Sequence, residues 1–203
     1  NLDFHDLILL AAKDVFSGRV GEIMATEISV IYYAFFNWEN RKIASNEFTY
    51  HSRSGSREVL GAFTFILLIE AFAMHLVLEM WSPVLAWILT FFSLYTALQV
   101  FALIRSMSKR PHLIENIKLY LRYGFMGNAA INLDDIASIE FDRKVPDDEG
   151  FKKLSIISEL DGHNVILNLK NEYELTRIYG LKDKFTAIGI FVDDKEQFKE
   201  KLF

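Results

Sequence analysis

Two long apolar stretches separated by a short turn dominate the hydropathy pattern. Val59–Met80 reads VLGAFTFILLIEAFAMHLVLEM, and Val84–Ile104 reads VLAWILTFFSLYTALQVFALI without a single charged residue. At 1.5 Å per residue, the 22 residues of the first stretch reach roughly 33 Å, enough to cross a hydrocarbon core about 30 Å thick. The linker Trp81-Ser82-Pro83 is short enough to return the chain only in the antiparallel direction. The pattern therefore predicts a two-span transmembrane hairpin over residues 58–106.

The segment before the hairpin has helical periodicity over residues 7–38 and ends in an aromatic cluster. Read at 100° per residue, its polar positions share one stripe, and its apolar positions lie on the other side. Two interpretations follow: a third transmembrane span with its polar face towards the hairpin, which we favour, or an amphipathic helix at the membrane surface. Residues 39–57 are expected to form a polar cytoplasmic link, so the N-terminal helix and link cover residues 1–57. The polar stripe comprises Gly18, Arg19, Glu22, Thr26, Ser29 and Tyr33.

After Pro111 the pattern changes to alternating apolar and polar positions, which is typical of β-strands. Residues 111–203 therefore predict a small all-β barrel with one C-terminal helix, which begins at the capping residue Asp194 and plugs one opening. The fourth and fifth strands are expected to form a hairpin. The seven predicted strands are Ile117–Phe125, Ala129–Asn132, Ala137–Asp142, Lys153–Leu160, Val165–Lys170, Glu174–Tyr179 and Thr186–Val192.

This order of elements resembles the bacterial pleckstrin-homology-like (PH-like) domain. The string INLDDIASIEF at Ile131–Phe141 and the ending GIFVDDKEQFKEKL at residues 189–202 look like recurring segments of that family. A two-span hairpin directly before such a domain also recurs there, so the resemblance covers residues 59–203. It implies a bacterial membrane protein with a PH-like domain that serves protein interaction and assembly more than binding of lipid headgroups. It implies a fold and no catalytic activity.

Composition supports a division into a membrane part and a soluble part. The chain is 51% hydrophobic and contains 18 phenylalanines, with a mean hydropathy of +0.16, and the apolar excess lies mainly in the predicted hairpin. The net charge is −5, and no block rich in Lys and Arg suggests nucleic acid as a partner. The sequence has no cysteine, which excludes disulfides and thiol catalysis.

The distribution of basic residues predicts the orientation of the hairpin. Both outer flanks are basic, whereas the turn has no Lys or Arg. The positive-inside rule then places both open ends and the C-terminal domain in the cytoplasm, and we expect the inner (plasma) membrane of a bacterium. The flanking basic residues are Arg53, Arg57, Arg105, Lys109 and Arg110. The tryptophans expected to form the interface belt are Trp38, Trp81 and Trp87.

Ionisable side chains inside the first span are candidate functional residues. Glu70 lies near the middle of its span and His75 lies further towards the turn; ionisable groups at such depths need partners. In an antiparallel hairpin that turns near residue 82, Glu70 lies opposite Ser93 and Tyr95. By the same register His75 lies opposite Thr90.

Three roles are open for these residues. Glu27, Glu70, His75 and His51 could form an intramembrane metal site or proton path, and imidazole with carboxylates would suit zinc, iron or manganese. They could instead be hydrogen-bonded residues that hold the helices together, or they could face another subunit. No H-E-x-x-H, phosphate-loop or G-x-S-x-G motif is present, so no recognised catalytic pattern supports the first role.

We therefore expect a non-enzymatic membrane accessory or scaffold subunit, whose C-terminal domain binds a protein partner or another copy of the chain. Its other partner is membrane lipid, and nucleic acid is not expected. The alternative is a membrane-embedded enzyme or transport component that uses the Glu/His site. Because the sequence begins at Asn1 rather than Met, the number of spans is a minimum.

Overall fold

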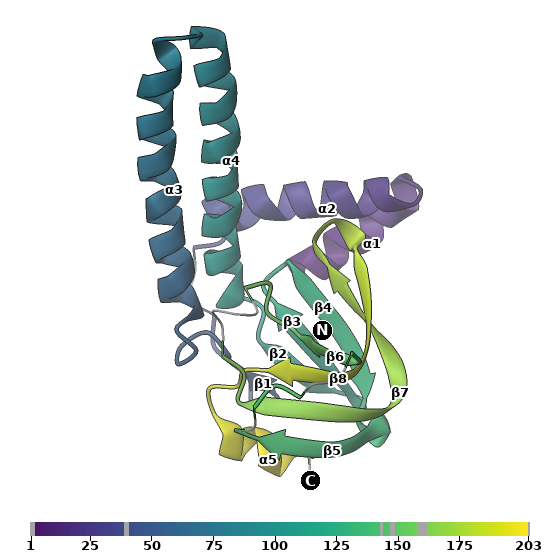
Figure 1. Cartoon of the computed structure of the whole chain (residues 1–203). Helices are drawn as coiled ribbons and strands as arrows, with labels where there is room; N and C mark the ends of the chain where they lie inside the picture. The colour runs from purple at the N-terminus through teal and green to yellow at the C-terminus, as the bar shows by residue number, and fades with distance from the viewer. Residues whose placement is uncertain (1–2, 39–40, 143, 147–148, 158–161, 203) are drawn as a thin grey trace.

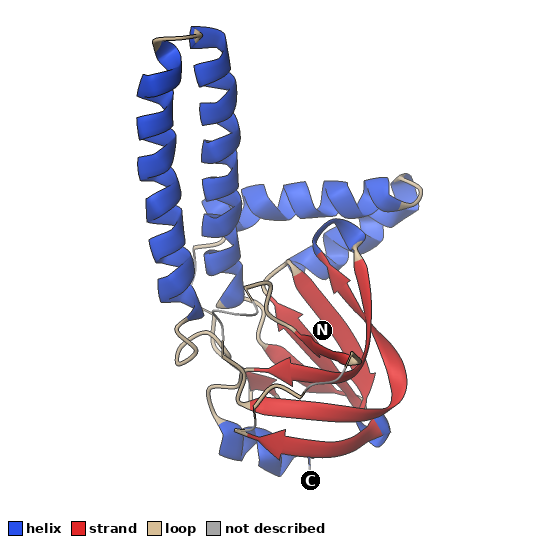
Figure 2. Ribbon diagram, in the orientation of Figure 1, coloured by secondary structure: helices blue, strands red, loops and turns tan. Residues whose placement is uncertain are grey.

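The computed structural model describes residues 3–38, 41–142, 144–146, 149–157 and 162–202. Figure 1 shows three parts: an upright hairpin of two long helices, a pair of shorter helices of which the upper one crosses the lower half of the hairpin, and a curled sheet beneath with a C-terminal helix. Figure 2 shows that strands make up most of this lower part, whereas the upright part is entirely helical. The separation of a helical hairpin from a β domain, predicted from sequence, is confirmed.

The hairpin consists of α3 (Ser56–Glu79) and α4 (Pro83–Met107). Ser82 caps α4 by accepting a hydrogen bond from the backbone amide of Leu85, and Pro83 occupies the first turn, where a missing amide hydrogen costs nothing. Both helices are long and apolar enough to cross a membrane, yet only 11% and 17% of their most apolar windows are buried. The core helices of a soluble protein would be mostly buried, so this hairpin is not one.

Two helices replace the single N-terminal helix predicted over residues 7–38. They are α1 (Phe4–Val15) and α2 (Arg19–Ile31), and α2 continues into a π-helical segment, η1 (Tyr32–Phe36). The chain reverses at Gly18, where φ is +64°, and α2 packs back on α1 and lies across α4 (Figure 1). Among the described residues only α3 and α4 are long and apolar enough to cross a membrane, and α2 runs crosswise to both (Figure 1). The favoured prediction of a third span is therefore wrong.

The β domain is one sheet in which the order is β1-β2-β3-β4-β7-β8-β6, with β5 paired on β7. All pairings are antiparallel except that of β6 with β8. Two short 3₁₀ segments follow β4 and β7. The elements are β1 (Glu47–Phe48), β2 (His112–Glu115), β3 (Lys118–Tyr123), β4 (Gly127–Asn132), η2 (Leu133–Asp135), β5 (Ile136–Phe141), β6 (Phe151–Lys153), β7 (Val165–Arg177), η3 (Ile178–Gly180), β8 (Lys182–Ile190) and α5 (Lys195–Leu202).

The predicted hairpin of Lys153–Leu160 with Val165–Lys170 is wrong. Phe151 pairs with Ala187 of β8 in parallel, because β5 and β8 already occupy the two edges of β7 in this region. Residues 158–161 lie outside the described residues. The separate strands predicted at 165–170 and 174–179 are one long strand, β7, whose register against β8 shifts between Asn168 and Tyr173.

The predicted polar link, residues 39–57, is partly a structural element of the β domain. Phe48 pairs with His112 in the short strand pair β1–β2, and the side chains of Phe48 and Tyr50 are both 2% exposed. The β domain therefore includes residues on both sides of the hairpin. A two-residue strand has no periodicity that a sequence pattern could reveal.

The C-terminal helix closes the core of the β domain. The carboxylate of Asp194 accepts a hydrogen bond from the backbone amide of Gln197 (3.0 Å), which confirms the predicted cap. Phe198 is completely buried and meets the ring of Phe48 edge-on at 5.0 Å, while Leu202 packs against the same core. Helix α5 therefore joins β1 to the rest of the core.

Replacing Phe198 with alanine removes a completely buried aromatic ring, and we expect a loss of about 3–5 kcal/mol in the stability of the β domain. Amide hydrogen exchange of β7 and β8 in the detergent-solubilised full chain measures this loss. The matched control is Glu200→Ala on the exposed face of α5, which should change the exchange very little. Equal protection in the two variants would contradict the role assigned to Phe198.

Candidate functional site

A narrow seam of small residues joins the two hairpin helices. Ala71, Ala86 and Ala97 are at most 6% exposed, and small side chains let helix backbones approach closely. His75 lies in the same seam, where its Nδ1 is 2.8 Å from Thr90 Oγ1, as the antiparallel register predicts. Trp87 meets the imidazole ring edge-on at 4.9 Å. The structure thus assigns His75 a hydrogen-bonded role between the two helices.

Glu70 lies outside this seam, on an exposed flank of α3. Its carboxylate has no hydrogen bond or ion pair with any residue in the described part of the chain. The predicted partners, Ser93 and Tyr95, do not reach it: Tyr95 donates its hydroxyl to Glu27 of α2 instead. The physical reason is that Ala71 and His75 occupy the side of α3 that faces α4, and Glu70 points about 100° away from that side.

A polar cluster connects α2, α4 and η3. The Glu27 carboxylate accepts hydrogen bonds from the hydroxyls of Tyr95 and Tyr179, the second at 3.1 Å. The Gln99 side chain donates to both hydroxyl oxygens, at 3.1 Å and 2.6 Å. Gly180 suits its place beside this cluster because its φ is +71°, which other residues rarely adopt, and a Cβ there would also displace the carboxylate of Glu22 on α2. The cluster fixes the β7–β8 turn against the hairpin.

The most buried charge in the described chain belongs to Arg110, directly after α4. Its guanidinium is 0% exposed and makes 2.6 Å contacts with Asp3, with Asp6 and with the carbonyl oxygen of Gly124. Arg122 of β3 completes the network, with its guanidinium nitrogens 2.9 Å from Asp6 and 3.6 Å from Asp3. This Arg–Asp network joins the end of the hairpin, the start of α1 and the β3–β4 turn.

The electrostatics of this network favour ionised partners. Burial alone would raise the pKa of Asp3, but the guanidinium groups of Arg110 and Arg122 outweigh it and lower the pKa below its ordinary value. Burial would likewise lower the pKa of Arg110, and the two aspartates raise it. Burial, with a contribution from Arg110, lowers the pKa of nearby His5 to about 3. His5 is therefore neutral at physiological pH, with Nδ1 2.8 Å from Ser29 Oγ.

A second clamp holds the start of α3. The carboxylate of Asp193, just before α5, accepts hydrogen bonds from the backbone amides of Ser52 (3.1 Å) and Arg53 (2.8 Å). The backbone amide of Asp193 donates to the carbonyl oxygen of Thr49 (2.8 Å). Both legs of the hairpin are thus attached to the β domain, one through Asp193 and the other through Arg110.

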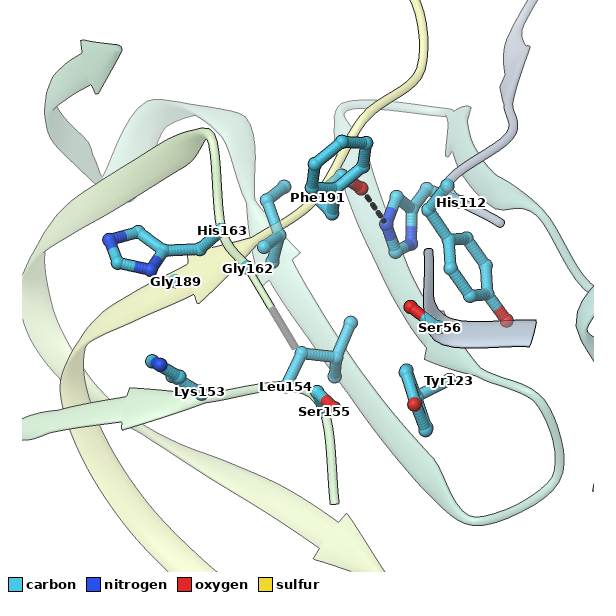
Figure 3. Close-up of a pocket in the computed structure, with 12 residues that line it drawn as sticks. Ser56, His112, Tyr123, Lys153, Leu154, Ser155, Gly162, His163, Gly189 and Phe191 are labelled. Atoms are coloured by element: carbon cyan, nitrogen blue, oxygen red, sulfur yellow. Dashed lines mark hydrogen bonds between the residues drawn. The ribbon is translucent and has the colours of Figure 1, made fainter. Parts of the chain in front are cut away.

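Buried His112 lies beside a small cavity of about 20 Å³ in the β domain. Figure 3 shows its imidazole hydrogen-bonded to the backbone at Phe191, with Tyr123 and Leu154 also lining the cavity. Nε2 donates to the Phe191 carbonyl oxygen (3.2 Å), and Nδ1 accepts from the backbone amide of Arg122 (3.1 Å). Burial lowers the pKa of His112 to about 4. The cavity has room for about one water, so this is a structural histidine and not a ligand site.

The four side chains proposed from sequence as one metal or proton site lie in four places. Glu27 is in the polar cluster, Glu70 on an exposed flank, and His75 in the hairpin seam. His51 lies before α3; burial, with a contribution from Arg57, lowers its pKa, and its Nδ1 is buried without a partner among the described residues. Within the described ranges, no group of three His, Cys, Asp or Glu side chains could hold a metal ion.

The tryptophans of the predicted belt are all exposed, at opposite ends of the hairpin. Trp81 and Trp87 are 82% and 65% exposed near the turn. Trp38 is near the other end, where the guanidinium of Arg105 lies 4.2 Å above its ring, a favourable cation–π contact. The two levels match the positions that aromatic residues take at the two faces of a bilayer.

A groove of about 460 Å³ separates α1 from the outer face of the sheet. Beside it β4 and β7 diverge: they pair only at Gly127–Arg177 and Asn128–Thr176, which leaves parts of both facing strand edges without a neighbour in the described sheet. Leu10 of α1 is 52% exposed at this groove. The remaining lining includes Leu9, Tyr120, Ala129, Ala130 and Tyr173. The lining of this groove is mainly apolar.

Comparisons with protein-family models, with curated proteins and with solved structures gave no match to this chain. Function is therefore inferred from the fold and its contacts alone.

Sequence reasoning missed the Arg–Asp network, because Arg110 was interpreted only as a basic residue that orients the hairpin. The spacing Asp3-x-x-Asp6 was the available signal, since it forms a reciprocal capping box at the start of α1.

Replacing Arg110 with methionine leaves two partly buried aspartates with a single counter-ion, and we expect a loss of about 3–5 kcal/mol in stability. Helix α1 should lose its amide-exchange protection first. Arg110→Lys should rescue little, because an ammonium group cannot reproduce the planar contacts to Asp3, Asp6 and Gly124. The control is Lys184→Met, which breaks an exposed ion pair with Glu172 and should cost under about 1 kcal/mol. A similar effect of the two methionine variants would refute the network's importance.

The lowered pKa of His112 predicts a pH-dependent stability. Between pH 6.5, its ordinary pKa, and about 4, its pKa in the fold, the unfolded chain binds a proton that the folded chain does not. Stability should therefore decrease as the pH falls through this window, by about 1.4 kcal/mol per pH unit. Thermal unfolding across this range should show a shallower decrease for His112→Gln. Because His5 is retained in both proteins, its contribution cancels. Parallel profiles would contradict the prediction.

Proposed function

We propose that this chain is a non-enzymatic integral membrane accessory or scaffold subunit. The hairpin anchors it in the inner membrane of a bacterium, and the β domain, of the bacterial PH-like type, lies at the cytoplasmic face and binds a protein partner. Each part of this proposal is supported by a separate feature of the structure.

Lipid contact is supported by the exposed surface of the hairpin. Phe65, Phe72, Trp87 and Phe91 are 65–67% exposed, and large apolar side chains cover both helices around the narrow seam. Soluble monomers rarely expose contiguous apolar patches of more than a few hundred Å². Lipid acyl chains can cover this apolar surface and keep it out of water without any protein partner.

The cytoplasmic orientation is supported by charge at the base of the hairpin. Arg53 and Arg57 are exposed there, whereas the turn Trp81-Ser82-Pro83 carries no charge. Basic residues favour the cytoplasmic side of a membrane. The β domain, which lies at the same end as these arginines (Figure 1), would then face the cytoplasm.

The observation that carries the scaffold proposal is the attachment of both hairpin legs to the β domain. An anchor alone needs only a flexible tether, yet Arg110 and Asp193 join the two legs to the sheet through buried or well-aligned polar contacts. Such a mount fixes the orientation of the β domain relative to the membrane. A fixed orientation is useful to a protein that presents a binding surface to a neighbour.

The groove beside α1 is the surface we assign to the partner. Its lining is mainly apolar, and the diverging edges of β4 and β7 offer unpaired backbone groups. An extended segment of a partner protein can add to such edges and place alternate side chains in the recess. Asp6 and Arg122, which also line the groove, are already engaged with each other.

The alternative, an enzyme or transport component with a Glu/His metal site, has no comparable support, because its four residues are dispersed. Elemental analysis for zinc, iron and manganese in the purified chain tests it directly. A stoichiometric metal that Glu70→Gln and His75→Ala both remove would favour the alternative over a scaffold.

Photo-cross-linking in native membranes tests the proposed function. A photoreactive residue in place of Leu10 should give one discrete protein adduct, whereas the same residue in place of Glu200 on α5 should give little or none. Leu10→Asp should abolish co-purification of that partner in mild detergent and leave the thermal stability within about 0.5 kcal/mol, because Leu10 is exposed. A chain that purifies alone as a monomer, with no adduct at Leu10, would refute the scaffold proposal.

A further inference from the structure

Helix α2 has its apolar side exposed and its small or polar side buried. Its exposed apolar residues recur at spacings of four, four, three and four, so they form one stripe along α2 and η1. They are 37–60% exposed. The stripe comprises Val20, Met24, Ile28, Ile31 and Phe35.

The opposite side of α2 is completely covered. The buried residues are mainly small or polar, namely Gly21, Ala25, Thr26 and Ser29, with Val30 as the one large apolar side chain among them, and this side packs against α1, α4 and the η3 turn. A Cβ on Gly21 would lie 3.0 Å from the carbonyl oxygen of Ala12 on α1, so the two helices are in close contact. A helix on the surface of a soluble protein would show the reverse distribution, with its apolar stripe covered and its polar side exposed.

The direction in which the stripe faces follows from what covers the other side. In Figure 1, α1 and the β7–β8 turn lie between α2 and the sheet, and α2 runs crosswise to the hairpin. The covered side of α2 therefore faces the β domain. The exposed stripe faces the side towards which α3 and α4 extend.

From this arrangement we infer that α2 and η1 lie in the plane of the membrane interface, with the apolar stripe inserted among the lipid acyl chains of the leaflet next to the β domain. The occupant of this face is the lipid surface itself and not a protein groove. The inference rests on the membrane anchoring proposed above and adds a second, in-plane contact to it.

The depth of α2 along the hairpin fits this placement. The Tyr95 hydroxyl donates to Glu27 of α2 and accepts from Gln99, which places α2 near the level of Ala97. The thirteen rises from there to Val84 measure about 20 Å. An interfacial helix lies about 5–10 Å inside the boundary of the acyl chains. The length along α4 and the depth of the helix together come to about 25–30 Å, which agrees with the thickness of a hydrocarbon core.

Two local features suit the same depth. At the end of the stripe nearest the hairpin, Phe36 and Trp38 are 73% and 60% exposed, and Arg105 lies over the Trp38 ring; aromatic and basic residues are common at this level. Glu27, the acidic residue of α2 beside the stripe, has its two carboxylate oxygens bonded by tyrosine hydroxyls. An ionisable group near acyl chains needs such partners.

Site-directed spin labelling tests the inference, because a chain without cysteine accepts single cysteine probes directly. The full chain carries one label at Met24→Cys or Ile31→Cys and is reconstituted in vesicles of phosphatidylcholine and phosphatidylglycerol. Phe72→Cys on α3 is the lipid reference, and Glu200→Cys on α5 is the aqueous reference. All four side chains are exposed, so the labels should leave the fold unchanged.

We expect the labels at positions 24 and 31 to be more accessible to oxygen than to a water-soluble nickel chelate, as at position 72, though at a shallower depth. Accessibility matching position 200 would overturn the inference. Labels that are immobile and shielded from both reagents would also overturn it, because a second copy or another protein would then cover the stripe. If position 72 itself is in water, the proposed anchoring fails; if position 72 is in lipid and the stripe is in water, only the interfacial helix fails.

Discussion

Arg110 follows directly after α4, and its guanidinium contacts three parts of the molecule at once without touching solvent. A buried guanidinium is stable only where several acceptors surround it, and here they come from the first turn of α1 and from the β3–β4 turn. The positions of α1, the hairpin and the sheet are therefore mutually dependent. Gly124 contributes to the same constraint: a Cβ there would lie 2.4 Å from Ser106 Oγ and 2.6 Å from Leu103 on α4.

The other polar contacts extend this constraint outward. Asp193 holds the start of α3, and Glu27 with Tyr95 and Tyr179 holds α2 between the hairpin and the β7–β8 turn. Each contact joins elements that differ in their proposed surroundings: acyl chains, interface or water. Apolar packing acts across the same boundaries, because one continuous core contains Tyr33 of η1, Leu103 of α4 and Leu121 of the sheet. Polar side chains and apolar burial thus together determine how the parts are oriented.

How far the sequence could predict this structure depends on the distance along the chain over which an interaction acts. The register from His75 to Thr90 follows from the short turn between them, and the cap at Asp194 is local, so both could be predicted. Asp3 and Arg110 are 107 positions apart, and Glu27 and Tyr95 are 68 positions apart; no periodicity links such residues. The third span was predicted because the helical periodicity was continuous from residue 7 to the aromatic cluster near residue 38. Gly18 was counted as one position of the polar stripe, whereas the helix breaks there.

Strand β1 precedes the hairpin and strand β2 follows it, so α3 and α4 are an insertion between neighbouring strands of one sheet. If the hairpin spans a membrane as proposed, Phe48 cannot meet His112 until α3 and α4 have been synthesised and brought back to the same side of the bilayer. Completion of the sheet edge is therefore coupled to correct insertion: a hairpin that fails to return leaves Phe48 and Tyr50 without their core and β2 without its outer neighbour. During biogenesis, complete folding of the β domain would thus indicate that its own membrane anchor has inserted with the correct topology.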